Sequence, residues 1–236
     1  MKAILFSGLS MMDQSSVRES LIRIPEVLNR IKSAQKTIDQ LTNSSVELIN
    51  CMLDDDRTYA ANCKIKRVLV NLVQLGLYDR HIKHYDKPKY FVGSISNLSA
   101  IEHCLGFSYI DEFVRSVWFQ DLEGSETDLP VLSESKYQDI QVIQMMNRKP
   151  TQFYIYEFNQ LSLEMAESRK IDEADTADKL IVRLIKKHDV KQIVNLGPSD
   201  LLLDPVYNPF HLEDINVYNT IEIDPMLSWF YARLAC

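Results

Sequence analysis

Three short apolar runs that end directly in glycine constrain the fold more than any other feature of the chain. They read ILFSG from Ile4, YFVGS from Tyr90 and IVNLG from Ile193. Each run is short and is followed by a residue that turns easily, which is typical of a buried strand. Long segments with helical spacing of apolar residues separate them. This alternation predicts an α/β fold with a parallel β-sheet flanked by helices.

Helical periodicity is clearest in three segments. Apolar residues recur every three or four positions over residues 15–41, where Pro25 is expected to break or restart the helix. The same spacing covers residues 65–77, and Gly76 then stands where a C-cap is expected. Residues 175–188 form a third amphipathic pattern. These segments are long enough to cover the predicted sheet.

The region after residue 120 has weaker patterns. Residues 121–130 are acidic and contain glycine and proline, which is typical of a linker. Residues 152–158 alternate like a strand, and residues 162–169 have the composition of a helix.

Charge and composition exclude several classes of function. The chain has 26 Lys and Arg against 33 Asp and Glu, a net charge of −7, which argues against a non-specific nucleic-acid binder. No apolar run is long enough for a membrane span, and the N-terminal apolar stretch is too short for a signal peptide. The four cysteines form no CxxC pair. Reduced thiols in the cytoplasm are therefore expected, with no membrane partner.

No metal or cofactor is predicted. The run Asp54-Asp55-Asp56 reads as a solvated loop or helix cap, with divalent-cation binding as the alternative. His81 and His84 could share a helix face, but no carboxylate or thiol pattern completes a site around them. Cys104 falls on a predicted apolar face, which indicates a buried and inert thiol.

Four motifs follow one another in an order that resembles a known enzyme family. The chain reads FSGLS from Phe6, IPEVL from Ile24, FVGSISNLSAIEHCLGFSYIDEFV from Phe91 and VNLGPS from Val194. Together they resemble the malonyl-CoA:acyl-carrier-protein transacylases and the acyltransferase domains of polyketide synthases. The resemblance implies an acyltransferase core formed by residues 1–122 and 175–236. Residues 123–174 would then be a reduced small subdomain or an insertion.

The resemblance also implies where catalysis would occur. One alignment of the family's nucleophile turn, GHSLG, places Ser94 at the nucleophile, with the backbone N–H groups of Leu9 and Ile95 as the oxyanion hole. The other alignment matches Gly93 to the first glycine and places Ile95 at the nucleophile. The chain has only 6 glycines, and neither alignment keeps both glycines of the turn. Such a strained turn tolerates bulkier residues poorly.

Two further residues of the family's site, a histidine and an arginine, have no counterpart at the matching positions of this chain. The family activates its serine with a histidine in a stretch like HSPLM, and the nearest stretch here has Asn159. His103 is expected on a surface or half-buried, and His188 at a helix end. The family's arginine, which pairs with the malonyl carboxylate, is represented by Arg115, two residues early and therefore on another face of its helix.

Three hypotheses about function follow. The first is a degenerate, catalytically impaired acyltransferase-like protein that acts as a binding or structural partner in fatty-acid or polyketide assembly. Acyl carrier protein or synthase subunits would be its partners. The second is an active acyltransferase or acyl hydrolase that uses Ser94 on acyl-CoA. The third is a protein-interaction module unrelated to acyl metabolism, suggested by the aromatic residues of segment 207–236. The oligomeric state is left open.

Overall fold

The structure of the chain is a computed structural model, and it describes most of the first half and selected strands of the second. The described residues are 2–6, 12–42, 46–88, 90–94, 97–120, 141–145, 152–159, 162–170, 191–197 and 216–220. The predicted linker at 121–130, the predicted helix at 175–188 and most of the aromatic-rich segment 207–236 lie outside them.

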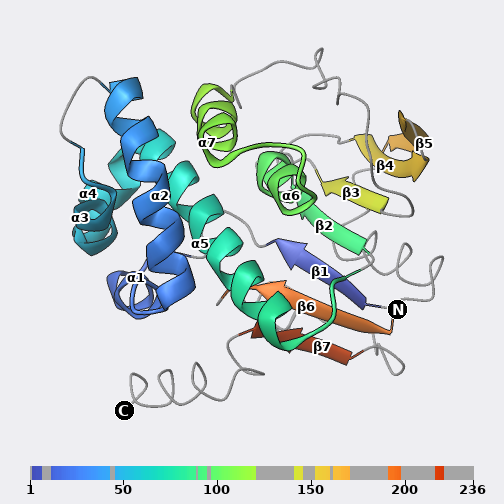
Figure 1. The fold of residues 1–236 in the computed structure, drawn as a ribbon, viewed down its shortest axis with the longest axis horizontal. Coiled ribbons are helices and arrows are strands. Elements are labelled where there is room, and N and C mark those ends of the chain that lie inside the picture. The colour runs from blue at the N-terminus through green and yellow to red at the C-terminus, as the bar shows by residue number, and fades with distance from the viewer. Residues whose placement is uncertain are drawn as a thin grey trace.

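Within the described segments a seven-stranded sheet forms the centre of the fold, in the order β5-β4-β3-β2-β1-β6-β7 (Figure 1). The strands are β1 (Lys2–Phe6), β2 (Tyr90–Ser94), β3 (Gln141–Met145), β4 (Gln152–Asn159), β5 (Ser162–Lys170), β6 (Gln192–Leu196) and β7 (Asn216–Asn219). The pairs β1·β2, β1·β6, β2·β3 and β6·β7 are parallel, whereas β4 and β5 join through antiparallel pairings. The predicted parallel sheet flanked by helices is confirmed.

The strand order reverses at β1. From β1 the chain proceeds to β2 and β3 on one side, and β6 and β7 lie on the other side. The carboxyl ends of β1, β2 and β6 therefore meet at one edge of the sheet, at a point where the strand order reverses. Open α/β sheets bind their ligands at such a point.

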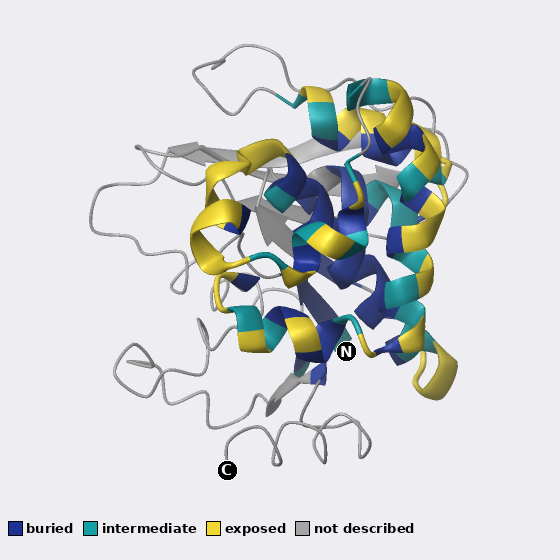
Figure 2. Cartoon of the chain, turned by 90° about the vertical axis from the view of Figure 1, so that its left-hand side faces the viewer, coloured by how far each residue is buried: buried dark blue, intermediate teal, exposed yellow. Residues whose placement is uncertain are grey.

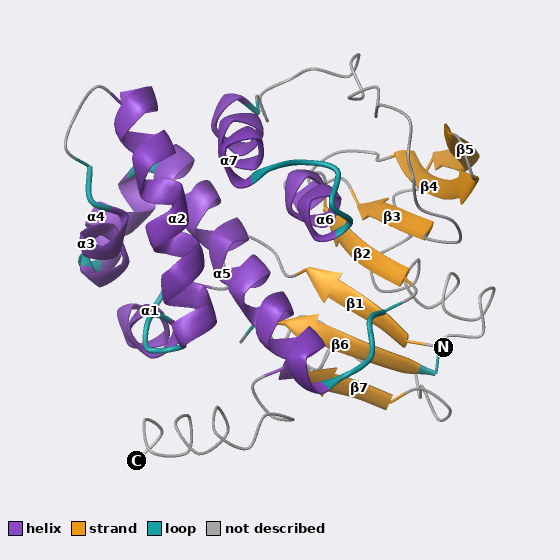
Figure 3. Cartoon of the chain, in the orientation of Figure 1, coloured by secondary structure: helices purple, strands orange, loops and turns teal. Residues whose placement is uncertain are grey.

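Helices form a layer beside the sheet, as Figure 3 shows in purple. They are α1 (Ser15–Leu21), α2 (Pro25–Thr42), α3 (Leu48–Leu53), α4 (Asp56–Ala61), α5 (Cys63–His84), α6 (Leu98–Cys104) and α7 (Ile110–Phe119). Pro25 starts α2, as predicted, because a proline at the first helical position loses no hydrogen bond. Asp55 caps α4 by accepting from the N–H groups of Arg57 and Thr58, so the helix-cap interpretation of the acidic run holds.

Helix α5 is the centre of the core. Its residues are buried from Val68 through Leu77 on every side, because α2, α6 and α7 pack around it and the Tyr78 ring contacts Phe91 of β2 at 5.9 Å. Figure 2 shows this buried interior in dark blue beneath exposed outer helices. In the described part of the chain, no helix, α5 included, is long and apolar enough to cross a membrane.

Gly76 is not a C-cap, contrary to the sequence prediction, because α5 continues for two more turns to His84. Instead it lies where α5 crosses α2. A Cβ atom at this position would lie 2.5 Å from the Cα and 2.7 Å from the N of Val27. The glycine is required by the close approach of two helix backbones.

The prediction of a helix at residues 162–169 is wrong. This segment is β5, and it pairs with β4 along its whole length, from Asn159 opposite Ser162 to Gln152 opposite Lys170. Helix formers such as Leu163, Glu164 and Met165 dominate its composition. The pairing with β4 continues to both ends of β5 despite one register shift after Ile155, and such pairing outweighs a weak local preference.

Arg18, on α1, connects this helix to α3 and α4. No feature of the sequence pointed to this role. Its side chain is fully buried. The guanidinium donates to the carbonyl oxygens of Met12, Asp13, Met52 and Asp54 at 2.6–3.1 Å, and to Oδ1 of Asp56 at 3.0 Å. It also lies 4.2 Å from the ring centroid of Tyr59. One side chain thus satisfies backbone carbonyls that the loops leave without helical partners.

Candidate functional site

The carboxyl edge of the sheet carries a strand–turn–helix unit. Strand β2 ends at Ser94 and α6 begins at Leu98, so three residues separate the strand from the helix. Ser94 stands opposite Met145 of β3 in the parallel register. This is the place that the sequence assigns to a nucleophile. Leu9 and Ile95, the predicted oxyanion-hole residues, lie outside the described residues.

A buried pair of amides anchors this turn. The Asn97 side chain donates to Oε1 of Gln74 at 2.9 Å, and both residues are fully buried. Asn97 occupies the N-cap position of α6, yet its side chain makes no capping hydrogen bond. It bonds to α5 instead, so the end of the turn after Ser94 is fixed to the central helix. Hydrogen bonds between buried amides are costly to break, because a partner left alone loses its solvation.

Helix α6 is fixed to α7 by two contacts, and its His103 also reaches α2 through Arg30. The hydroxyl oxygens of Ser99 and Ser116 lie 2.8 Å apart. His103, in the last turn of α6, lies against the Phe113 ring at 5.5 Å between centroids. The unit after β2 is therefore held by α5, α7 and, through His103, by α2.

His103 is a structural residue of this helix layer. Nη1 of Arg30 donates to His103 Nε2 at 2.8 Å, so Nε2 is the acceptor. The Nδ1–H then donates to the Ser108 carbonyl at 2.8 Å. Arg30 is itself held by both carboxylate oxygens of Asp79, at 2.6 and 2.8 Å. Burial, and then the Arg30 charge, lowers the pKa of His103. The half-buried position agrees with the sequence interpretation, and both ring nitrogens are in use.

The other described histidines lie at the opposite edge of the sheet from Ser94. His81 lies in the last turn of α5, and His84 ends the helix. The segment that follows α5 lies at the start of β1, where Lys2 Nζ donates to the Asp86 carbonyl at 3.4 Å. The buried His81 ring stacks on Tyr85 at 4.8 Å. Burial, with a smaller effect of Lys2, lowers its pKa to about 4. His188 and His211 lie outside the described residues. In the described part of the chain, His81 and His103 thus make their contacts with Tyr85, Arg30 and Ser108.

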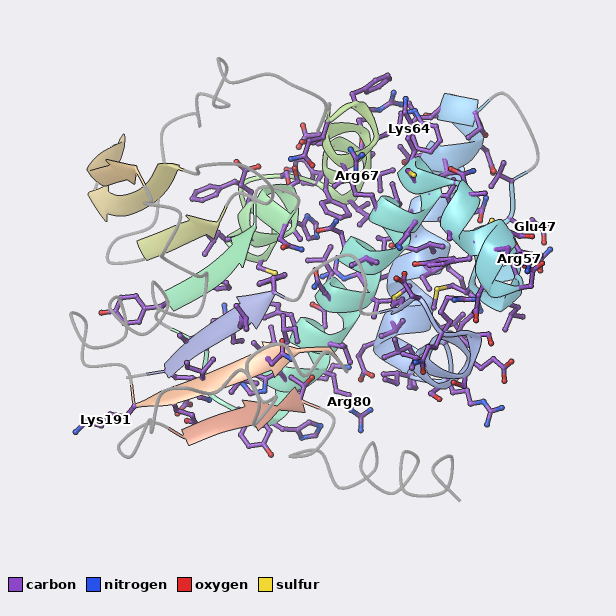
Figure 4. The ribbon with its side chains drawn as sticks, turned by 180° about the vertical axis from the view of Figure 1, so that it is seen from behind. Glu47, Arg57, Lys64, Arg67, Arg80 and Lys191 are labelled. Atoms are coloured by element: carbon purple, nitrogen blue, oxygen red, sulfur yellow. The ribbon has the colours of Figure 1, made fainter. Side chains whose placement is uncertain are left out.

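The two arginines near α7 differ in position. Arg115 is exposed and donates to Oε1 of Gln40 at 2.8 Å, so it is a surface residue, as its displaced position in the sequence indicated. Arg67, on α5, is buried and donates through Nη1 to the carbonyl of Gln120, which ends α7. Figure 4 shows Arg67 beside α7, at the same end of α5 as Lys64. Sequence reasoning missed Arg67. The sequence shows it only as the last of three cations, after Lys64 and Lys66, before the apolar run of α5.

The described part of the chain holds no group of three or more His, Cys, Asp or Glu side chains arranged for a metal ion. The described cysteines, Cys51, Cys63 and Cys104, are free. Burial raises the pKa of Cys51 and Cys104, so neither thiol is activated as a nucleophile.

Comparison with solved structures identifies the fold. The acyl-carrier-protein S-malonyltransferase of Burkholderia pseudomallei aligns with a TM-score of 0.57 at 9% identity, covering 100% of this chain and 99% of that one. The malonyl-CoA:ACP transacylase of Synechocystis sp. PCC 6803 aligns with a TM-score of 0.53 at 10% identity, covering 92% and 96%. The chain has the fold of the malonyl-CoA:acyl-carrier-protein transacylases.

A third similar structure is the malonyl-CoA acyl carrier protein transacylase of Coxiella burnetii, with a TM-score of 0.53, 11% identity, and coverage of 99% and 96%. No protein-family model and no curated protein matches the chain. At such low identities the structural likeness establishes the acyltransferase fold. The family resemblance expected from four short motifs is confirmed at that level, and the division into residues 1–122, 123–174 and 175–236 stays a prediction.

Glu102, on α6 next to His103, provides a test of the helix layer by pH. Its carboxyl is half-buried, and burial raises its pKa from 4.5 to about 7. The folded state therefore holds this proton more tightly than the unfolded chain. The resulting stabilisation is complete below pH 4.5 and is lost as the pH rises through 7.

We expect Glu102→Gln to gain stability relative to the parent by about 2 kcal/mol when both are moved from pH 5 to pH 8. Urea unfolding followed by circular dichroism measures this difference. Since the lowered pKa values of His81 and His103 act in the opposite sense and are common to both proteins, the difference isolates Glu102. An equal difference at both pH values would contradict the burial of the carboxyl.

Proposed function

We propose that this protein is an acyltransferase-fold binding partner in acyl-chain assembly, impaired in acyl transfer. One observation carries the proposal. Of the described histidines nearest in sequence to Ser94, His103 has both ring nitrogens in hydrogen bonds, and His81 and His84 lie near the amino end of β1. A serine hydroxyl is a weak nucleophile without an adjacent base. General-base catalysis typically contributes about 10²–10⁴-fold to a rate.

The retained architecture supports a binding role. The turn after β2 is fixed by the Gln74–Asn97 pair, and β1, β2 and β6 still bring their carboxyl ends to one edge. The similar solved structures are named as transferases that act with an acyl carrier protein. We extend that partner to this chain: an acyl carrier protein presents its thioester at the carboxyl edge, and the chain holds it there without transferring the acyl group.

Intact-mass measurement tests the catalytic half of this proposal. The protein is incubated with malonyl-CoA and, separately, with acetyl-CoA, beside an active malonyl transacylase as positive control. We expect no acyl adduct on this protein and a clear adduct on the control. An adduct that forms on the parent and disappears in Ser94→Ala would overturn the proposal. It would establish the second candidate, an active acyltransferase, which the preserved strand–turn–helix unit favours.

Fluorescence anisotropy with a labelled acyl carrier protein tests the binding half. We expect saturable binding that weakens with salt if charged surfaces contribute. Absence of binding to both the free and the malonyl-loaded carrier would contradict the carrier as partner. The hypothesis of an interaction module outside acyl metabolism would then be preferred.

A further inference from the structure

His103 joins the end of α6 to α2 and to the loop that leads to α7. Its Nε2 atom accepts from Nη1 of Arg30 at 2.8 Å, and its Nδ1–H donates to the Ser108 carbonyl at 2.8 Å. The Phe113 ring of α7 lies against the imidazole, at 5.5 Å between centroids. One half-buried side chain therefore connects α2, α6 and the start of α7.

The two hydrogen-bond partners of the imidazole determine its protonation state. A guanidinium has N–H donors and no acceptor, so Nε2 must present its lone pair to Arg30. A carbonyl oxygen only accepts, so the ring proton must be on Nδ1, facing Ser108. A second proton would be placed on Nε2, 2.8 Å from a guanidinium nitrogen that also carries hydrogens. The geometry is therefore compatible with the neutral ring alone.

Arg30 is not free to move away from such a proton. Its Nε and Nη2 atoms donate to the two carboxylate oxygens of Asp79, at 2.6 and 2.8 Å, and both side chains are half-buried. Burial, and then the Arg30 charge, lowers the pKa of His103 and outweighs the opposite effects of the Ser108 contact and the Asp79 charge. The imidazole is therefore the group that must leave when the ring takes up a proton.

The other described titratable groups around His103 do little to stabilise an imidazolium. On α6, burial raises the pKa of Glu102 to about 7 and that of Cys104 well above its usual range, so both are mostly neutral where a histidine titrates. On α5, burial raises the pKa of the Tyr78 phenol, which is neutral as well. On α7, the Glu112 carboxylate accepts from a backbone N–H of the loop at 2.8 Å. A protonated ring at this position lacks a carboxylate of its own.

We propose that His103 is a proton-sensitive latch, which holds the end of α6 and the following loop on α2 while its ring is neutral and releases them when its ring is protonated. The released ring has the ordinary histidine pKa of 6.5, above that of the latched ring. As the pH falls, the released state takes up its proton first, so the latch is closed above pH 6.5 and weakens below it. It requires neither a carrier protein nor an acyl group, so it is independent of the proposed function.

The release is expected at one end of α6. The N–H groups of Gly106 and Phe107 bond to carbonyls in the last turn of the helix, both at 3.0 Å, and these bonds close the helix end beside the latch. The other end of α6 is held by the Asn97 and Gln74 amides, which do not titrate. Amide exchange in residues 103–109 therefore reports the latch. Because one proton is taken up per opening, the opening constant rises by at most about tenfold for each pH unit.

Hydrogen–deuterium exchange of the full chain, followed by mass spectrometry at pH 7.5 and pH 5.5, tests the latch. In His103→Gln the amide oxygen keeps an acceptor for Arg30 and cannot take up a proton. We expect the ratio of exchange rates, parent over variant, to rise by about 3- to 10-fold over residues 103–109 when the pH is lowered. The ratio should stay constant over the buried part of α5, residues 68–77. His84→Gln, at the exposed end of α5, is the matched control and should follow the parent at both pH values.

Proton NMR of the histidine rings gives a second reading, which does not depend on the folding of His103→Gln. We expect His103 of the parent to titrate below pH 6.5, and about one unit higher in Arg30→Gln, because the charge that opposes protonation is removed. A thermal melt at pH 7.5 shows whether each variant is folded. An exchange ratio that is equal at both pH values overturns the proposal. So does a His103 ring that titrates at or above pH 6.5 in the parent, or that is unaffected by Arg30→Gln.

Discussion

Replacement of Gly76 by alanine is expected to lower the free energy of unfolding by about 2 kcal/mol or more. A Cβ atom at Gly76 would overlap the Cα, N and Cγ2 atoms of Val27, at 2.5, 2.7 and 2.8 Å. Alanine gains about 1 kcal/mol in helix preference, whereas overpacking of a well-packed core costs about 1–3 kcal/mol and more where backbone atoms must move. Here α2 and α5 would have to separate. The steric cost therefore exceeds the gain.

Urea unfolding of the Gly76→Ala protein measures this effect, with Asn29→Ala on the exposed face of α2 as the control. The control should change stability by no more than about 0.5 kcal/mol. The double variant Gly76→Ala with Val27→Ala gives a sharper test. Since the two closest atoms belong to the Val27 backbone, shortening that side chain should not restore stability. Restoration would show that the contact is with the side chain.

Arg18→Met is expected to lower the free energy of unfolding by about 3–5 kcal/mol, the largest effect of any substitution considered. The change removes one partner of a buried charged network and leaves several loop carbonyls without donors. Methionine keeps the length and the apolar stem, so the loss reports the guanidinium itself. Against a typical total stability of about 5–15 kcal/mol, the helices α1, α3 and α4 should lose their packing first.

Asp56→Asn is the control that separates the ion pair from the backbone contacts. Asp56 is largely exposed, with 56% of its side chain accessible, so its salt bridge to Arg18 should contribute no more than about 1 kcal/mol. Arg18→Lys should lie between the two variants, because a lysine keeps the charge and donates to fewer carbonyls at once. If Asp56→Asn costs as much as Arg18→Met, the carboxylate rather than the carbonyls is the essential partner.

The parallel core could be predicted because its signals are local. Runs such as YFVGS and IVNLG are short, apolar and bounded by glycine, and Gly197 indeed adopts a positive φ of 144°. Gly106 follows the end of α6 with a φ of 83°. At these positions one residue and its neighbours determine the conformation, so apolar periodicity and the turn residues were sufficient to predict it.

The contacts of the site could not be predicted, because each depends on residues distant in sequence. Gln74 and Asn97 are polar residues in apolar or helical contexts, and only the crossing of α5 behind β2 makes them partners. Gly76 was interpreted as a cap because the sequence does not show that Val27 lies against it. Arg18 reads as an ordinary charged position of an amphipathic helix. Amides inside an apolar run, Asn71 and Gln74, were the available signal in α5.

The position of β1 has a consequence for how the chain folds during synthesis. This strand is formed by residues 2–6, yet one of its two neighbours in the sheet is β6, at residues 192–196. Closing this pairing joins residues such as Ile4 and Val194, which are 190 positions apart, and contacts of large sequence separation are associated with slow folding. At a synthesis rate of about 5–20 residues per second, about ten seconds or more pass between the synthesis of β1 and that of β6, its neighbour on one side. Until β6 is made, that edge of β1 has unpaired backbone N–H and C=O groups, and such an edge can pair with another chain.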